Sequence, residues 1–326
     1  MKLDAGNGGA RWVNDFGHAL FEEVKLIIGN LEIDKMDDLQ MHIEELLSTP
    51  SDLRTDSLTL QSQSTATLTT WGQGQRLLYV DLPWYFTQHP GYHLPTVGMY
   101  LSKIELQVKL RKKEDLIVSG GGAYDIAADP VSILDFGVSA DLFLLSEAEQ
   151  NYFADGAFFH VVTQHQHWEG LIRAGQTSQR VQFELSHPVK ELNIVFRKTS
   201  NVAAKSYYNF SGDGVDPFPS EAFESMYLQI NQSDYMEPTD PLYYRLLENK
   251  MHHTVVPDKH IYTISFGMYP QLLDSTGTLN FSRLDKATLI IKFPAALSED
   301  YEIHIIAKSI NGMTIENGVT RMEFGG

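Results

Sequence analysis

Residues 274–285 read Asp274-Ser275-Thr276-Gly277-Thr278-Leu279-Asn280-Phe281-Ser282-Arg283-Leu284-Asp285, and residues 286–293 continue as Lys286-Ala287-Thr288-Leu289-Ile290-Ile291-Lys292-Phe293. The Asp, Ser and Gly residues at the start of this segment are typical of turns. The β-branched and aliphatic residues that follow are typical of a strand. A polar turn that leads directly into a short apolar run is a pattern of all-β proteins. The segment therefore predicts a strand over residues 286–293.

Other segments repeat the strand signal. Apolar and polar residues alternate with a period of two, which is the pattern of a strand with one buried face. The clearest alternating runs are residues 103–110, 181–185, 192–196, 260–266 and 301–307. Many short strands separated by polar loops favour a sandwich or a barrel over alternating βα units.

Two short segments favour helices instead. Residues 37–47 have apolar side chains at helical spacing and acidic residues in the first turn, where they suit the helix dipole. Ser146 is followed three residues later by Glu149, which is the pattern of a capping box at the start of a helix.

The composition is that of a globular protein with a sizeable core. The chain has 326 residues, of which 43% are hydrophobic and 21% are charged. No apolar run approaches the 18 residues of a membrane-spanning helix, and residues 1–7 lack the apolar core of a secretory signal. The absence of cysteine excludes disulfides and thiolate metal sites, and it fits folding in a reducing cytosol.

The charge is acidic and uneven. The net charge is −17, of which −13 falls within residues 1–170. This balance argues against direct binding of nucleic acid, which requires clustered Lys and Arg. The one basic cluster, Arg111-Lys112-Lys113, is followed at once by Glu114-Asp115 and is interpreted as a solvated turn at a strand end, with a phosphate site as the less favoured alternative.

Two long Gly-rich or Pro-rich loops are expected at residues 119–128 and 211–220, and the boundary between two domains is expected within residues 170–178.

Several blocks, in order along the chain, resemble one family of viral proteins. The blocks are the segment 274–285, Trp12-Val13-Asn14-Asp15-Phe16-Gly17-His18-Ala19-Leu20 with its continuation to Lys35, Leu82-Pro83-Trp84-Tyr85-Phe86-Thr87-Gln88-His89-Pro90-Gly91-Tyr92-His93-Leu94-Pro95, Asp141 to Glu149, and Ser186-His187-Pro188-Val189-Lys190-Glu191-Leu192. Together they resemble the major capsid proteins of nucleocytoplasmic large DNA viruses, of the iridovirus and phycodnavirus type.

The resemblance implies an all-β fold of two tandem jelly-roll sandwiches with short helices in the loops, the first over residues 1–172 and the second over residues 178–326. It implies a structural protein and not an enzyme, without a cofactor, that forms homotrimeric, pseudo-hexagonal capsomers of an icosahedral shell. The implied partners are further copies of the chain, neighbouring capsomers, minor capsid proteins and an inner viral membrane. The implied location is the virion, after synthesis and assembly in the host cytoplasm.

The chain departs from the family pattern at its N-terminus. In the family, the Trp12-Val13-Asn14 block is preceded by the first strands of the first jelly roll, whereas here it begins about ten residues after Met1. The first jelly roll is therefore expected to lack its opening strands, which leaves neighbouring backbone groups unpaired. We expect the chain to need a longer natural N-terminus or a donated strand in order to fold stably.

Two other functions stay open on the residues alone. A cupin-type metal domain or a carbohydrate-binding jelly roll is the first, and His165, His167, Glu169 and His187 are its only approximation to a metal set. A His-x-His on a strand places both rings on one face, but such residues are more often on the surface. A capsid-related scaffold protein that is shed before maturation is the second.

The remaining motifs are weak. His252 and His253 would point to opposite faces of a strand and make a poor chelate. Residues 6–9 only partly resemble a phosphate loop, and no nucleophile elbow occurs. Glycosylation sequons at Asn209, Asn231 and Asn280 are interpreted as chance occurrences. Trp84-Tyr85-Phe86 predicts either a strand end at an interface or an ordinary core strand.

Overall fold

Strands carry most of the fold, and the helices are short. The computed structural model describes residues 2–4, 11–50, 53–61, 64–71, 76–118, 132–212 and 220–324. The prediction of a mostly β chain with short helices is confirmed. Among the described helices, none is both long enough and apolar enough to cross a membrane.

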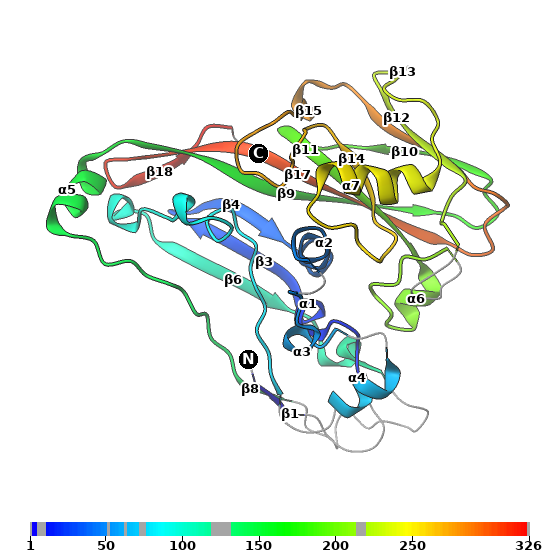
Figure 1. Cartoon of the computed structure of the whole chain (residues 1–326), viewed down its shortest axis with the longest axis horizontal. Coiled ribbons are helices and arrows are strands. Elements are labelled where there is room, and N and C mark those ends of the chain that lie inside the picture. Colours follow the sequence, from blue (N-terminus) through cyan, green and yellow to red (C-terminus); the bar gives the residue numbers. More distant parts are fainter. Residues whose placement is uncertain are drawn as a thin grey trace.

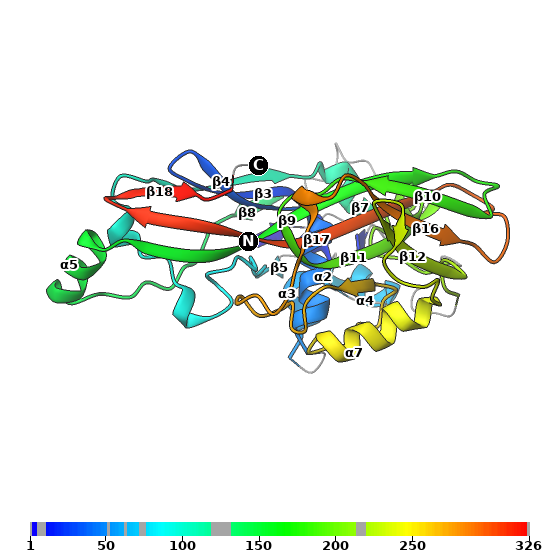
Figure 2. The same ribbon diagram turned by 90° about the horizontal axis from the view of Figure 1, so that it is seen from above.

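The central sheet is built around two long strands. Strand β9 (Phe158–Ile172) pairs along its whole length with β17 (Tyr301–Glu316), and β17 pairs on its other side with β11 (Pro188–Lys198). Strands β14 (Tyr262–Ser265) and β15 (Leu279–Asn280) extend the sheet beyond β11, and β18 (Val319–Met322) forms a hairpin with β17. All these pairs are antiparallel, and Figures 1 and 2 show β9 and β17 running most of the length of the molecule.

A second sheet packs against one half of the central sheet. It has the order β10 (Ser178–Phe183), β16 (Ala287–Lys292), β12 (Ser225–Ile230) and β13 (Ser233–Asp234). Apolar residues from both sheets meet in one buried core, among them Phe183, Phe196, Leu228, Ile291 and Ile303. This packing of two antiparallel sheets is a β-sandwich.

The N-terminal part forms a second core beside the first. Its main sheet has the order β4 (Leu31–Met36), β3 (Phe21–Ile28) and β6 (Ile104–Leu110). Smaller pairings join β1 (Lys2–Asp4) to β5 (Arg76–Leu77) and β8 (Ser132–Asp135), and β2 (Arg11–Trp12) to β7 (Ile117–Val118).

Short helices fill the connections. Among the described residues they are α1 (Phe16–Ala19), α2 (Asp38–Ser48), α3 (Asp56–Thr59), α4 (Thr65–Trp71), α5 (Glu147–Asp155), α6 (Thr199–Ala203) and α7 (Asn249–His252), with a π-helical turn over Tyr243–Glu248 before α7 and 3-10 turns over Pro90–Tyr92, Thr96–Met99, Lys113–Leu116 and Phe281–Arg283. Both predicted helices are confirmed, and Ser146 and Glu149 form the predicted capping box.

The central sheet is a wall that the two cores share. Side chains on β17 alternate between the two cores: Ile303 and Ile305 point into the sandwich core, whereas His304 and Ile306 face the N-terminal part. The alternation at residues 301–307 therefore predicts the strand correctly. It does not reveal that the polar face is covered by another part of the chain.

The expected domain boundary falls in the turn between β9 and β10. Strand β9 lies on the N-terminal side of that boundary in sequence, yet it is hydrogen-bonded to β17 throughout. Strand β9 thus belongs to the same sheet as the C-terminal strands. The division into two domains at residues 172–178 stays a prediction, and no separation between sheets coincides with it.

The prediction of a strand at Trp84-Tyr85-Phe86 is wrong. These residues form a turn that precedes the 3-10 turn Pro90–Tyr92. Trp84 and Tyr85 are nevertheless buried in the N-terminal core. Their burial comes from side-chain packing, with the Tyr85 ring centre 6.3 Å from that of His160 on β9, and does not require backbone pairing.

We predict that Trp84→Ala lowers the free energy of unfolding by about 3–5 kcal/mol, because it leaves a cavity where a 3% exposed ring fills the core. Denaturant unfolding of the purified chain measures this change. Tyr79→Ala is the control, since Tyr79 is 58% exposed and its truncation should cost little. Equal losses for the two variants would contradict the assignment of Trp84 to the core.

Candidate functional site

The face of the central sheet that points toward the N-terminal part carries charged side chains in rows. One row crosses three strands, with Glu191 on β11 opposite Lys308 on β17 and Lys308 opposite His165 on β9. All three residues are buried. Burial of a charge is costly unless a partner neutralises it, so this face needs opposite charges from whatever covers it.

Helix α2 provides one partner. Lys308 Nζ lies 2.5 Å from Glu44 Oε1, and the two side chains come from positions 264 residues apart in sequence. Burial acts to lower the pKa of Lys308, but the charges of Glu44 and Glu191 outweigh it and raise that pKa. Burial acts to raise the pKa of Glu44, but the charges of Lys308 and His165 lower it. Both groups are therefore held in their charged forms.

Strand β4 supplies the partner of the first β9 histidine. His165 Nδ1 lies 2.8 Å from Asp34 Oδ2, and the backbone N–H of His165 donates to Asp34 Oδ1 at 2.7 Å. Although burial opposes protonation, the adjacent Asp34 carboxylate raises the pKa of His165. The loop that leads into α2 provides the next carboxylate, because Asp37 binds His167 Nδ1, and His167 Nε2 lies 3.0 Å from His304 Nδ1.

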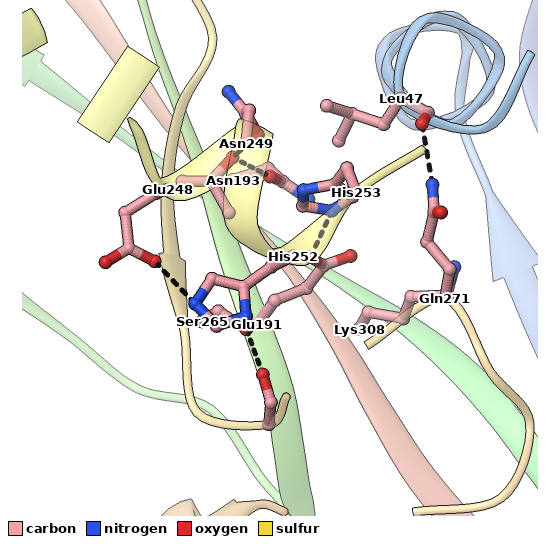
Figure 3. Close-up of polar contacts among 12 residues, drawn as sticks. Leu47, Glu191, Asn193, Glu248, Asn249, His252, His253, Ser265, Gln271 and Lys308 are labelled. Atoms are coloured by element: carbon pink, nitrogen blue, oxygen red, sulfur yellow. Dashed lines mark hydrogen bonds and ion pairs between the residues drawn. The ribbon is translucent and has the colours of Figure 1, made fainter. Parts of the chain in front are cut away.

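A further buried pair closes the other end of the Glu191 row. His253 Nε2 lies 2.7 Å from Glu191 Oε2, and Gln271 donates to the carbonyl oxygen of Leu47 at the end of α2 (Figure 3). Burial acts to raise the pKa of Glu191, but the charges of His253, Lys308 and Lys190 lower it to about 2. The sheet, α2 and the segment after α7 are thus joined by polar contacts in one place.

A cleft of about 570 Å³ opens at the edge of this covered face. Arg197 pairs with Glu302 at 2.7 Å on one side, and Arg111 pairs with Asp38 at 3.0 Å on the other. Lys205, a third cation of the lining, donates to the backbone carbonyl oxygens of Glu114 and Ile117. Because both arginines face carboxylates and Lys205 binds the backbone, the cations of the lining hold parts of the chain in register.

The four residues of the cupin-type alternative do not converge. His165 and His167 lie on one face of β9 as predicted, but they bind two different carboxylates. Glu169 is exposed, and His187 lies in a left-handed backbone conformation with its ring near Phe324. The expectation that the two β9 histidines lie on the surface is wrong, because α2 and β4 cover them.

The other predicted residues are placed as follows. Asn209 is 8% exposed and accepts a hydrogen bond from Ser211, Asn231 is exposed in a turn, and Asn280 is half-buried at the start of a 3-10 turn. Their modification stays a prediction. Lys112 and Lys113 are exposed after β6 as expected, but Arg111 stacks on Tyr207 and pairs with Asp38.

The prediction that His252 and His253 lie on a strand is wrong, because they lie at and just after the end of helix α7. Residues 6–9 and loop 119–128 lie outside the described residues, as does loop 211–220 except for residues 211, 212 and 220.

Sequence reasoning missed one further cluster. Asp15, His18 and His42 lie together in the N-terminal core, and they are the one group of potential metal ligands found among the described residues. Asp15 and His18 are three residues apart at the start of α1, which is a spacing that places two side chains on one side of a turn. The approach of His42 from α2 gives no signal in the sequence.

We predict that Lys308→Met destabilises the protein by about 3–5 kcal/mol, because it leaves Glu44 buried without its partner. The double variant Glu44→Gln with Lys308→Met should recover much of that loss, since it removes both charges. A double-mutant cycle by denaturant unfolding measures the coupling. Additive losses would show that the two groups do not depend on each other.

We also predict that ionised Glu191 contributes stability in the neutral range. Its pKa is lowered from 4.5 in the unfolded chain to about 2 in the folded protein. The contribution is therefore complete above pH 4.5 and is lost as the pH falls toward about 2. Unfolding free energies across this range should fall less steeply for Glu191→Gln than for the unaltered chain. Parallel curves would contradict this prediction, and Glu147→Gln on the exposed face of α5 is the control.

Comparisons with known proteins agree along the whole chain. Residues 149–320 match the family model described as large eukaryotic DNA virus major capsid protein, and residues 2–142 match the model described as major capsid protein N-terminus. The major capsid protein of Pyramimonas orientalis virus is 24% identical over 97% of this chain and 78% of its own length. That of Paramecium bursaria Chlorella virus 1 is 23% identical over 96% of this chain and 80% of its own length.

Solved structures give the same result for the fold. The capsid protein in the quasi-atomic model of the PBCV-1 virus capsid superposes with a TM-score of 0.78 at 20% identity, covering 100% of this chain and 88% of that one. The Faustovirus major capsid protein gives a TM-score of 0.72 at 14% identity, covering 94% of this chain and 73% of that one. The family is one of structural proteins, so the prediction that the chain is not an enzyme is confirmed. The chain belongs to the major capsid proteins of large eukaryotic DNA viruses.

Proposed function

We propose that this capsid protein assembles as a homotrimer, a pseudo-hexagonal capsomer of an icosahedral shell. The observation that supports this proposal is an apolar surface segment between β8 and α5, residues 136–144, which runs along the outside of the molecule (Figure 1). Its side chains of Leu142, Phe143 and Leu144 are 83%, 66% and 100% exposed. Exposed apolar residues that are contiguous in this way are typical of protein–protein contacts.

The fold proposed for this role is two tandem jelly rolls over residues 1–172 and 178–326. The two buried cores on either side of the central sheet support two sandwich-like units. The similarity to the PBCV-1 capsid protein supports the same arrangement. A rigid pair of sandwiches suits a capsid subunit, because closed three-fold symmetry requires a fixed angle between successive contacts.

The proposed surroundings are those of a virus shell. Neighbouring capsomers and minor capsid proteins would contact the trimer in the virion, an inner viral membrane would lie beneath it, and synthesis and assembly would occur in the host cytoplasm. Loops 119–128 and 211–220 are proposed as outward-facing towers, on account of their polar, Gly-rich or Pro-rich composition. The acidic net charge of −17 argues against direct contact with the genome.

The alternative of a scaffold protein that is shed predicts a different location. Mass spectrometry of mature particles distinguishes the two roles, because a capsid subunit stays in the particle and a shed scaffold does not.

We predict that the triple variant Leu142→Ser, Phe143→Ser and Leu144→Ser does not form trimers, since the substitutions remove apolar area that trimerisation would bury. Light scattering coupled to gel filtration measures the mass. The melting temperature of the monomer should stay unchanged, because these side chains lie outside both cores.

Leu246→Ser with Leu247→Ser is the matched control, as these residues are also exposed, at 40% and 44%, but lie on the helical turn before α7. A monomeric unaltered chain, or a triple variant that still forms trimers, would overturn the assignment of residues 136–144 to the subunit contact.

A further inference from the structure

The cluster of Asp15, His18 and His42 lies at the centre of the N-terminal core. Asp15 Oδ2 is 2.7 Å from His18 Nδ1 and 2.5 Å from His42 Nδ1. The three residues are 0%, 3% and 0% exposed, and Tyr208 stacks on the His42 ring with 4.2 Å between the ring centres. Two imidazole nitrogens therefore converge on a single carboxylate oxygen in a site that solvent does not reach.

The second oxygen of Asp15 distinguishes this cluster from the other buried Asp–His pairs. Asp34 and Asp37 each bind one imidazole through one oxygen, and the other oxygen accepts a backbone N–H. Asp15 Oδ1 has no hydrogen-bond partner within the described part of the chain, although it is fully buried. Burial of a carboxylate oxygen without a partner costs free energy of folding. Such an atom calls for an explanation, and a bound ion near Asp15 would provide one.

The local backbone supports the same interpretation. Asp15 occupies the N-cap position of α1, where an Asp side chain usually accepts an N–H of the first helical turn, but its side chain makes no such bond. It adopts a left-handed conformation, with φ 52° and ψ 52°, and turns its carboxylate toward the two rings. The Asp15 side chain thus makes no capping hydrogen bond, and its carboxylate faces the two imidazole rings as a metal ligand would.

We propose that Asp15, His18 and His42 bind one zinc ion as its three protein ligands. Glu45 Oε2 lies 3.7 Å from His18 Nδ1 but outside the group of ligand atoms that are within 4.8 Å of one another. Imidazole and carboxylate groups in a four-coordinate arrangement suit Zn²⁺. Zinc bonds of about 2.0–2.2 Å place neighbouring ligand atoms roughly 3.3 Å apart, so each ring nitrogen needs to move away from the Asp15 oxygen by less than about 1 Å to admit the ion.

A zinc ion here would join the start of the chain to helix α2. Asp15 and His18 lie at α1, whereas His42 lies on α2, which also carries the Glu44 partner of Lys308. The metal would therefore fix the helix on which the covered face of the central sheet depends.

The test uses the purified full chain, stripped of metal with a chelator and then titrated with Zn²⁺. We expect one zinc per chain by elemental analysis, a higher melting temperature on adding Zn²⁺, and the visible absorption of tetrahedral Co²⁺ when cobalt replaces zinc. Asp15→Asn and His42→Gln should each lower the zinc affinity by about 100-fold or more. The control Asp34→Asn alters a buried Asp–His pair outside the cluster and should bind zinc as the unaltered chain does.

Three results would count against the site. One is an unaltered chain that neither binds zinc nor melts at a higher temperature with it, a measurement that does not depend on whether any variant folds. Another is equal zinc binding by the unaltered chain and by folded Asp15→Asn, which would place the metal on surface histidines. Loss of binding in Asp34→Asn as well would also count against the assignment.

Discussion

The structure depends on one sheet that has an apolar face and a charged face, both of them buried. Strands β9, β17 and β11 present Ile303, Ile305 and their neighbours to the sandwich core on one side. On the other side they present the row of Glu191, Lys308 and His165. The apolar face would fold against any second sheet of suitable size. The charged face has few acceptable partners, because every buried charge needs an opposite charge within reach.

This constraint explains why the N-terminal part sits where it does. Asp34 within β4, Asp37 before α2 and Glu44 within α2 are spaced so that they meet His165, His167 and Lys308 in turn. A shift of α2 by one turn would separate Glu44 from Lys308 and leave both buried and unpaired. The main effect of the polar contacts is therefore to select one position of the N-terminal part on the central sheet. They fix one docking position, whereas the two apolar cores supply most of the stabilisation. A capsid subunit needs such a fixed shape, because small errors in the angle between its parts accumulate around a closed shell.

The sequence predicts the strands and helices well and their packing poorly, for a physical reason. Alternation at residues 103–110 and 301–307 and the capping pair Ser146 and Glu149 are local signals, and all three are confirmed. A polar strand face looks the same in sequence whether water or another part of the chain covers it, which is why His165 was expected on the surface. Trp84 shows the opposite case, since the sequence left open whether its ring lies in the core or at an interface, and the ring is buried in the core while the backbone forms a turn. The Asp15, His18 and His42 cluster depends on a contact across 27 residues between Asp15 and His42, and no local pattern encodes it.

The surface offers a contrast that bears on assembly. Strand β6 is an edge strand of the N-terminal sheet, and the apolar segment 136–144 runs outside the same part of the molecule. The central sheet, by comparison, has both faces covered by its own chain. Apolar surface and unpaired strand edges are features that favour association with other chains. Because they gather on the N-terminal part, the buried pairs of Lys308, Glu44 and the two β9 histidines fix the position of the contact surface that we propose. If that proposal holds, the interior network sets the geometry of assembly although none of its side chains touches a neighbouring subunit.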